Sequence, residues 1–186
     1  MPTSEEYIQA TDEELFSQVQ KNDEQAFRVL YRRYNRQIYG FCRRMLGDDK
    51  AAEDAFQTVI TTVYEKRDTF TGGSFSAWFY AIARNRCIKL LRKEKPTMRI
   101  DDMPGLENSL SHEPQEDIVL RDVIEQAIAT LPDDLREAFE LRYLDDYQYD
   151  KIASILDISL SLAKVRVFRA RKIIQKTLSP YLHELQ

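Results

Sequence analysis

The segment FSAWFYAIARNRCIKLLRK, residues 75–93, decides the fold of the first half of the chain. Its apolar residues, Trp78 and Phe79 among them, recur at helical spacing. Ser74 precedes the segment as an N-cap residue, and Pro96 follows it, where proline disfavours helix in the residue before it. The pattern predicts a helix between these two residues, with an apolar face that holds Trp78 in a core.

Three further helices are predicted before this segment, over residues 11–21, 22–47 and 48–66. The first begins at Thr11, because Glu14 three residues later completes the pattern of a capping box. The second carries an apolar stripe that is predicted to face the core: Phe27, Leu30, Tyr31, Tyr34, Ile38, Phe41 and Met45. Residues 1–10 are expected as a tail and residues 69–74 as a loop.

The apolar periodicity disappears between residues 96 and 117, where three prolines enter and six acidic residues accompany one arginine. This composition favours a linker over a packed element. Four more helices are predicted after it, over residues 118–130, 132–144, 148–156 and 159–178. We therefore expect an all-α chain, with a helical domain at 11–95, a flexible acidic linker at 96–117, a second helical domain at 118–182 and a tail at 183–186.

The chain has 186 residues, a formal net charge of −4 and a pI near 5.4. This length excludes a long multidomain enzyme, and the overall acidity argues against a general nucleic-acid coat. The N-terminus has no basic region followed by an apolar stretch, and no long apolar run occurs, so we expect a cytoplasmic protein without membrane insertion. Cys42 and Cys87 are expected as buried free thiols, and the ligand spacing predicts neither a metal nor a cofactor.

The charge is divided sharply between segments. Residues 84–95 hold six basic residues and one glutamate, and residues 164–176 hold six basic residues and no acid. Residues 118–163 carry ten acidic and four basic residues. Two short basic helices on an acidic protein predict two separate phosphate contacts. Charged runs are more often solvated helix faces, and that alternative stays open on charge alone.

Residues 149–159 have the pattern of a helix-turn-helix. Ala153 stands where two helices approach closely, Ile158 can fill the turn, and Ser159 can cap the next helix. On that next helix, four residues are predicted to face the bundle: Ala163, Val167, Ala170 and Ile174. The opposite face and its shoulders form the candidate DNA-contacting surface: Ser161, Lys164, Val165, Arg166, Phe168, Arg169 and Lys172.

Two further surfaces in the first domain can carry chemistry. A basic helix after an aromatic segment suits melted DNA, because unstacked bases need a flat surface and phosphates need charge. Since the helix aromatics are predicted to be core, the better candidates to receive a base are Thr69, Phe70, Thr71 and the nearby Asn85. The third helix also presents a polar stripe outward: Glu53, Asp54 and Gln57. Such a stripe is ordinarily solvated and becomes informative only with a large partner.

The chain carries several motifs in order: AEDAFQ at residues 52–57, FSAWFYAIARN at residues 75–85, and Leu131-Pro132 with RARK at residues 169–172. Together they resemble the bacterial sigma factors of the extracytoplasmic-function group, the promoter-specificity subunits of RNA polymerase. The resemblance covers nearly the whole chain. It implies that Glu53, Asp54 and Gln57 bind a coiled coil on the largest catalytic subunit of core RNA polymerase.

The resemblance also implies two DNA contacts, with promoter DNA bound both as duplex and as melted single strand. The melted minus-ten element would be held by Thr69, Phe70, Thr71, Arg84, Asn85, Arg86, Lys89 and Arg92. The minus-thirty-five element would be contacted by the candidate residues of the last helix, in a domain that also binds the polymerase flap. An anti-sigma factor is a further candidate partner.

Several positions depart from the family pattern. Thr58 stands where a glutamate usually follows the glutamine, and Asp157 replaces the common turn glycine. On the last helix Val165 replaces a serine and Phe168 a histidine, so the middle of the reading face has nothing to donate to or accept from base edges. We hypothesise that minus-thirty-five readout is poor and that an accessory protein assists recruitment. Methyl contacts in a conventional promoter are the equal alternative.

Two other functions compete with a sigma factor. A dimeric helix-turn-helix regulator that acts without polymerase explains the second domain but leaves the aromatic, basic helix of the first unused. A helical adaptor would treat both basic helices as solvated surface. An enzyme is the least expected class, because the chain lacks a glycine-rich phosphate loop, a nucleophile elbow and enough histidines for acid–base chemistry.

Overall fold

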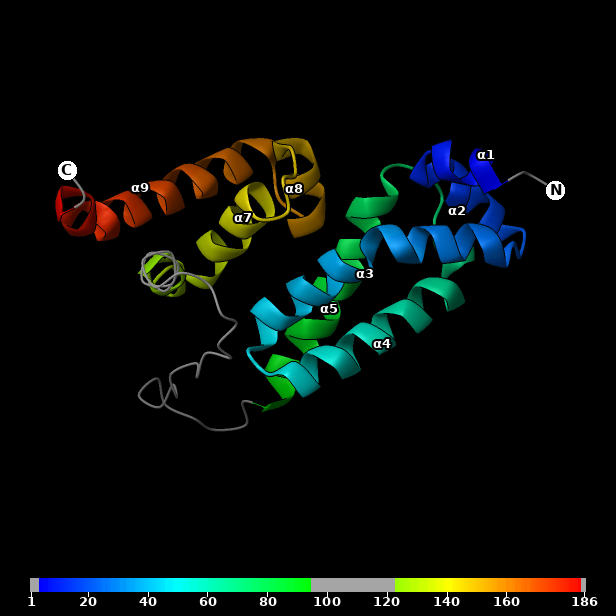
Figure 1. Ribbon diagram of the computed structural model, residues 1–186, viewed down its shortest axis with the longest axis horizontal. Coiled ribbons are helices and arrows are strands. Elements are labelled where there is room, and N and C mark those ends of the chain that lie inside the picture. Colours follow the sequence, from blue (N-terminus) through cyan, green and yellow to red (C-terminus); the bar gives the residue numbers. More distant parts are fainter. Residues whose placement is uncertain (1–3, 95–122, 185–186) are drawn as a thin grey trace. The chain divides into compact units, whose positions relative to one another are not determined.

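All regular secondary structure is helical in the computed structural model, which describes residues 4–94 and 123–184. The chain divides into two units, residues 1–106 and 107–186. Figure 1 shows helices α1 to α5 in the first unit and α7 to α9 in the second. The predicted all-α class is therefore confirmed, while the predicted linker at residues 96–117 lies outside the described residues.

Four helices form the body of the first unit and match the four predicted there: α2 (Asp12–Gln20), α3 (Glu24–Leu46), α4 (Asp49–Glu65) and α5 (Phe75–Glu94). Helices α3 and α4 run side by side in opposite directions, and α5 packs against both (Figure 1). Helix α2 packs against α3 and α5. The largest fully buried side chains of these helices are Leu15, Phe16, Leu30, Ile38, Phe41, Phe75 and Tyr80.

The helix ends lie where the sequence predicts them because their caps are local. The Glu14 backbone N–H donates to the Thr11 hydroxyl at 3.2 Å, and the Thr11 backbone N–H donates to the Glu14 carboxylate at 2.8 Å. Asp23 caps α3 by accepting backbone hydrogen bonds from its first turn. Gly47 ends α3 with a φ of 70°, a left-handed conformation that favours glycine.

The predicted core stripe on α3 is wrong at Tyr31. This side chain is 38% exposed, whereas Leu30, Tyr34 and Ile38 are buried. Residues four apart stay on one helix face, and Tyr31 lies about 100° around the helix from Leu30, on the flank of that face. Its ring packs instead near Phe56 of α4, with 6.1 Å between the ring centroids.

The N-terminal residues do not form the predicted tail. Ser4–Gln9 form helix α1, and Tyr7 is buried. The Tyr7 hydroxyl donates to the Asp23 carboxylate at 2.6 Å, and the Arg33 guanidinium donates to the carbonyl oxygens of Ile8 and Ala10 at 2.8 and 2.9 Å. Arginine thus satisfies carbonyls that a helix C-terminus leaves without an internal partner. The local pattern missed this helix because its partners lie 16 or more residues away.

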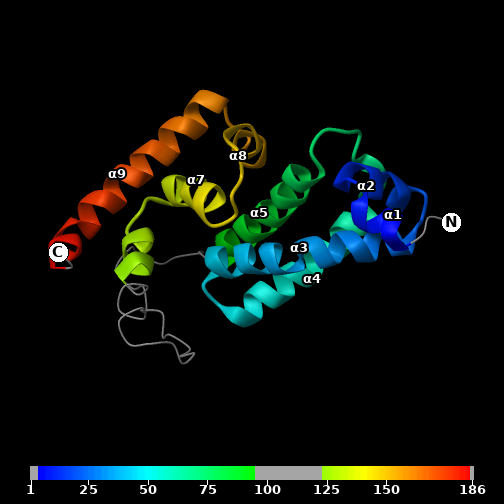
Figure 2. The same ribbon diagram turned by 45° about the horizontal axis from the view of Figure 1, so that its top comes forward.

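The second unit contains a helix over residues 123–129, then α7 (Asp133–Tyr143), α8 (Tyr149–Leu156) and α9 (Leu160–Glu184). Helix α9 packs against both α7 and α8, with α8 beside its N-terminal end (Figure 2). The residues predicted to face this bundle are all buried, which confirms the orientation of the last helix: Ala163, Val167, Ala170 and Ile174.

The predicted end of the last helix before Pro180 is wrong. Helix α9 continues through Pro180 to Glu184, so the predicted tail at residues 183–186 begins inside it. The fixed φ of proline suits a helix, and its missing N–H removes one backbone hydrogen bond. Pro180 is exposed near the end of α9, where few backbone hydrogen bonds of the helix remain to be lost.

Cys42 on α3 and Cys87 on α5 are buried and belong to no disulfide, as predicted. A hydrogen bond from the Cys87 side chain lowers the pKa of the Cys42 thiol below its ordinary value of 9.0, because it stabilises the thiolate. Within residues 4–94 and 123–184, none of the helices is long and apolar enough to span a bilayer.

Candidate nucleic-acid interface

The loop between α4 and α5 carries the residues predicted to receive a base. It begins with a short 3₁₀ helix, η1 (Arg67–Thr69), and ends with Gly72 and Gly73 at φ values of 121° and 89°. Thr69 and Thr71 are exposed. The Thr69 hydroxyl donates to the carbonyl oxygen of Lys66 at 2.7 Å, so its oxygen remains available as an acceptor.

Phe70 is half-buried and packs into an aromatic cluster. Its ring centroid lies 5.3 Å from Phe16 and 5.3 Å from Trp78. Trp78 contacts Phe16 but is only half-buried, so the prediction that it lies in the core is met only in part. The loop therefore offers Thr69 and Thr71 to solvent, while Phe70 anchors it to the body of the unit.

Two residues of α2 that the sequence did not single out also contact this region. The Gln20 side-chain amide donates to the carbonyl oxygens of Arg67 and Phe70, each at 2.9 Å. The Glu13 carboxylate accepts from the Phe75 backbone N–H at 3.0 Å, at the first residue of α5. The partners of Gln20 lie 47 and 50 residues away, and no spacing rule relates such positions.

The other residues predicted to contact melted DNA lie on α5, from Arg84 onward. Asn85, Lys89 and Arg92 are exposed, and their spacing of four and three residues sets them on one face. Arg84 and Arg86 are half-buried. Three of the residues predicted to contact DNA therefore form one exposed stripe on α5, whereas the two arginines are more buried.

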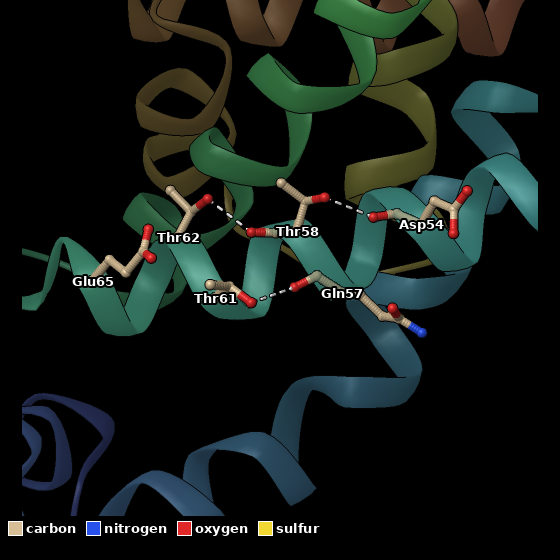
Figure 3. Close-up of a pocket in the computed structure, with 6 residues that line it drawn as sticks. All are labelled: Asp54, Gln57, Thr58, Thr61, Thr62 and Glu65. Atoms are coloured by element: carbon tan, nitrogen blue, oxygen red, sulfur yellow. Dashed lines mark hydrogen bonds between the residues drawn. The ribbon is translucent and has the colours of Figure 1, made fainter.

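The polar stripe predicted on α4 is exposed, and it borders a shallow hollow of about 400 Å³. Figure 3 shows the residues that line this hollow: Asp54, Gln57, Thr58, Thr61, Thr62 and Glu65. Each threonine hydroxyl donates to the carbonyl oxygen four residues earlier, as Thr58 does to Asp54 at 2.8 Å. The negative charge at the hollow comes from the carboxylates of Asp54 and Glu65, and Glu53 adds a carboxylate on the adjoining surface.

The turn before α9 accommodates an unusual residue. Asp157 adopts a left-handed φ of 54°, at the position where the family pattern has glycine. The Ile158 backbone N–H donates to the Ala153 carbonyl oxygen at 3.0 Å, and the Leu162 N–H donates to the Ser159 hydroxyl at 3.2 Å. The helix-turn-helix geometry and the predicted Ser159 cap are therefore both formed.

The predicted reading face of α9 is largely exposed. Val165 and Phe168 are 41% and 51% exposed, and the Lys172 ammonium lies 4.9 Å from the Phe168 ring centroid. Ser161, Lys164 and Arg169 are also exposed. Arg166 is the exception: its side chain is 20% exposed and forms an ion pair with Asp134 of α7.

The two units match two parts of one family: residues 30–97 match Sigma-70 region 2, and residues 121–174 match Sigma-70, region 4. The chain is 34% identical over 174 residues to the ECF RNA polymerase sigma factor SigW of Bacillus subtilis (strain 168), covering 87% of this chain and 93% of SigW. It is 32% identical over 190 residues to the ECF RNA polymerase sigma-E factor of Escherichia coli (strain K12), covering 94% and 97% of the two chains. It also resembles the sigma factor RpoE, solved in complex with the anti-sigma factor NepR from Bartonella quintana, with a TM-score of 0.68, 25% identity and coverage of 82% and 96%.

Proposed function

This chain belongs to the sigma-70 family as an extracytoplasmic-function sigma factor, and from that premise we propose that its two units divide promoter recognition between them. The first unit binds core RNA polymerase and captures the melted minus-ten strand. The second contacts the minus-thirty-five element and the polymerase flap. The chain is a sigma factor and not an enzyme. Its net charge of −4 suits this role, because weak binding to duplex DNA alone favours meeting polymerase first.

The polymerase contact is assigned to Glu53, Asp54 and Gln57 on α4. All three are exposed, and two of them border the hollow of Figure 3. The carboxylates would meet basic residues of the coiled coil on the largest catalytic subunit, and the Gln57 amide can both donate and accept hydrogen bonds. Thr58 adds no charge, and its hydroxyl proton is held by the Asp54 carbonyl.

The minus-ten contact combines the α4–α5 loop with α5. Extruded bases would be received by Thr69, Phe70, Thr71 and Asn85, and the backbone phosphates would follow Lys89 and Arg92. Arg84 and Arg86 border the same stripe. Capture of an extruded base offsets the few kcal/mol that unstacking costs, so binding energy drives strand opening. The observation that carries this proposal is that the anchored loop leads into α5, whose second half exposes the stripe of Asn85, Lys89 and Arg92.

The minus-thirty-five contact is assigned to α9, with poor sequence readout at its centre. Val165 and Phe168 are exposed yet carry no side-chain hydrogen-bonding groups, so thymine methyls are the main base feature they can contact. Lys164, Arg169 and Lys172 can still hold phosphates. An accessory protein that contacts the apolar centre would assist recruitment.

An anti-sigma factor is a further proposed partner. The support is the 25% identity and matching fold of RpoE, which is solved with the anti-sigma factor NepR. Binding of such a factor would withhold the chain from polymerase until a signal releases it.

The main experiment adds the purified chain to core RNA polymerase and measures promoter-dependent run-off transcription. We expect a stable complex with core and transcripts that start at one position. Charge reversal by Asp54→Lys should reduce complex formation, and the control Glu24→Lys reverses an exposed acid at the start of α3. Failure to bind core, together with dimeric binding to duplex DNA, would establish the regulator alternative.

A selection from a randomised upstream element tests the minus-thirty-five proposal. With this chain and core polymerase alone, we expect a diffuse consensus at that element. A sharp consensus would refute accessory recruitment and favour conventional methyl contacts.

A further inference from the structure

Side chains of α2 contact the α4–α5 loop and the start of α5. The Gln20 amide donates to two loop carbonyl oxygens, those of Arg67 and Phe70, each at 2.9 Å. The fully buried Phe16 ring lies 5.3 Å from Phe70, centroid to centroid. Beyond the loop, the Glu13 carboxylate accepts from the first backbone N–H of α5 at 3.0 Å.

The loop depends on such outside contacts because its own sequence gives it little rigidity. Gly72 and Gly73 are exposed, and apart from their chain neighbours no heavy atom lies within 4 Å of the place a Cβ would occupy. Glycine also has the largest range of backbone conformations to lose on ordering. A side-chain amide has two N–H donors, and in Gln20 they satisfy carbonyls at both ends of the segment that contains Thr69.

We propose that Gln20 is a positioning residue for promoter opening, which keeps the α4–α5 loop in the form that receives an extruded base. Gln20 acts through Arg67 and Phe70 and does not touch DNA. This inference rests on the proposed function, since it assigns the geometry of the same site to a residue of another helix. Glu13 supports the same loop by fixing the start of α5.

Exchange between a side-chain amide and a carboxylate has different consequences at Gln20 and at Glu13. Gln20→Glu removes both donors and sets a carboxylate against two carbonyl oxygens. Glu13→Gln keeps an oxygen that can accept from the Phe75 N–H. Gln37→Glu, at an exposed position on α3, controls for the added charge.

The test measures holoenzyme affinity for a single-stranded oligonucleotide of the minus-ten element, taken from a promoter selected with the same holoenzyme. Each base is replaced in turn by an abasic site. For the wild-type holoenzyme, an abasic site at one or more positions should lower the affinity for the strand. Gln20→Glu should bind the intact strand about tenfold more weakly, as expected for two lost hydrogen bonds. An abasic site at the sensitive positions should then lower the affinity of this variant only slightly further. Glu13→Gln and Gln37→Glu should behave as wild type.

The outcomes separate this inference from the proposed function. If the wild type is insensitive to every abasic site, base capture itself is refuted. If Gln20→Glu keeps the full wild-type sensitivity, base capture stands and the role of Gln20 is refuted. If Gln20→Glu and the donor-free Gln20→Met both fail to assemble holoenzyme, Gln20 is a folding residue and the inference is overturned.

Discussion

Arg166 of α9 and Asp134 of α7 form an ion pair, with 3.3 Å between the Arg166 Nε and the Asp134 carboxylate. Only 20% of the Arg166 side chain is exposed, whereas Lys164 and Arg169 on the same helix are exposed. The pair ties the candidate recognition helix to a helix that precedes the turn. The position of a cation on a helix therefore does not by itself identify a DNA contact, because an acid on a neighbouring helix can engage it.

Alanine substitutions should separate Arg166 from its neighbours. Arg169→Ala is expected to weaken binding to duplex promoter DNA and to lower the salt slope by about one, because an exposed phosphate contact is lost. Arg166→Ala should change the slope less and destabilise the chain by up to about 1 kcal/mol. Affinity measured over a series of salt concentrations checks both, and equal slopes for the two variants would contradict the structural role of Arg166.

Lys89→Ala on α5 is expected to weaken binding of the holoenzyme to melted promoter DNA regardless of sequence. One lost phosphate contact should lower the salt slope by about one, and Arg84→Ala should do the same. Lys50→Ala, at an exposed position at the start of α4, serves as the control. An unchanged salt slope in the Lys89 variant would show that this face of α5 is solvated and does not contact phosphates.

Thr58→Glu is expected to strengthen binding to core polymerase by about threefold. The added carboxylate extends the acidic face formed by Glu53 and Asp54, and a single exposed ion pair contributes only a modest free energy. Competition for labelled core polymerase measures the change. Thr61→Glu, on the same hollow one turn away, is the matched control. An equal gain in that variant would show a general effect of charge and not a specific contact.

The docking of α1 should depend on pH through Asp23. The hydrogen bond from the Tyr7 hydroxyl lowers the pKa of the Asp23 carboxyl below its ordinary value of 3.8, because it stabilises the charged form. This contribution to stability is present above about pH 3.8 and is lost as the pH falls through the lower pKa of the folded state. Tyr7→Phe should raise the Asp23 pKa toward 3.8 in an NMR titration.

Glu14 provides the internal control for that titration. A hydrogen bond from the Thr11 backbone lowers the pKa of its carboxyl, and Tyr7 plays no part in it. Tyr7→Phe should therefore leave the Glu14 pKa unchanged. Equal shifts at both carboxyls would indicate a general loosening of the N-terminus and would contradict a specific Tyr7–Asp23 contact.

Asp157→Gly is expected to stabilise the chain by about 0.5–1 kcal/mol, because glycine adopts the left-handed backbone without strain. The native Asp157 holds a φ of 54° in the turn before α9. Urea denaturation followed by circular dichroism measures the change. Gly47→Ala, at a φ of 70°, is the reciprocal variant and should lose about 1 kcal/mol. A loss of stability in Asp157→Gly would show that the aspartate side chain itself supports the turn.

Local signals predicted most of the helices correctly. The capping box of Thr11 and Glu14 and the Asp23 cap join residues within three positions of each other, so the sequence displays both partners together. The buried face of α9 also follows from helical spacing alone. The error at residues 1–10 occurred because α1 is held by residues on other helices, whereas Tyr31 lies on the flank of the buried face of its own helix.

By itself the sequence determined which segments are helical, where most of them begin, and that two basic helices belong to an acidic chain. These properties depend on the backbone and on residues within one helical turn. Only the tertiary structure decided that Gln20 holds a loop 47 to 50 residues later, that Arg33 completes α1, and that Arg166 pairs with Asp134. Such contacts form only after packing has brought distant segments together, so no local pattern encodes them.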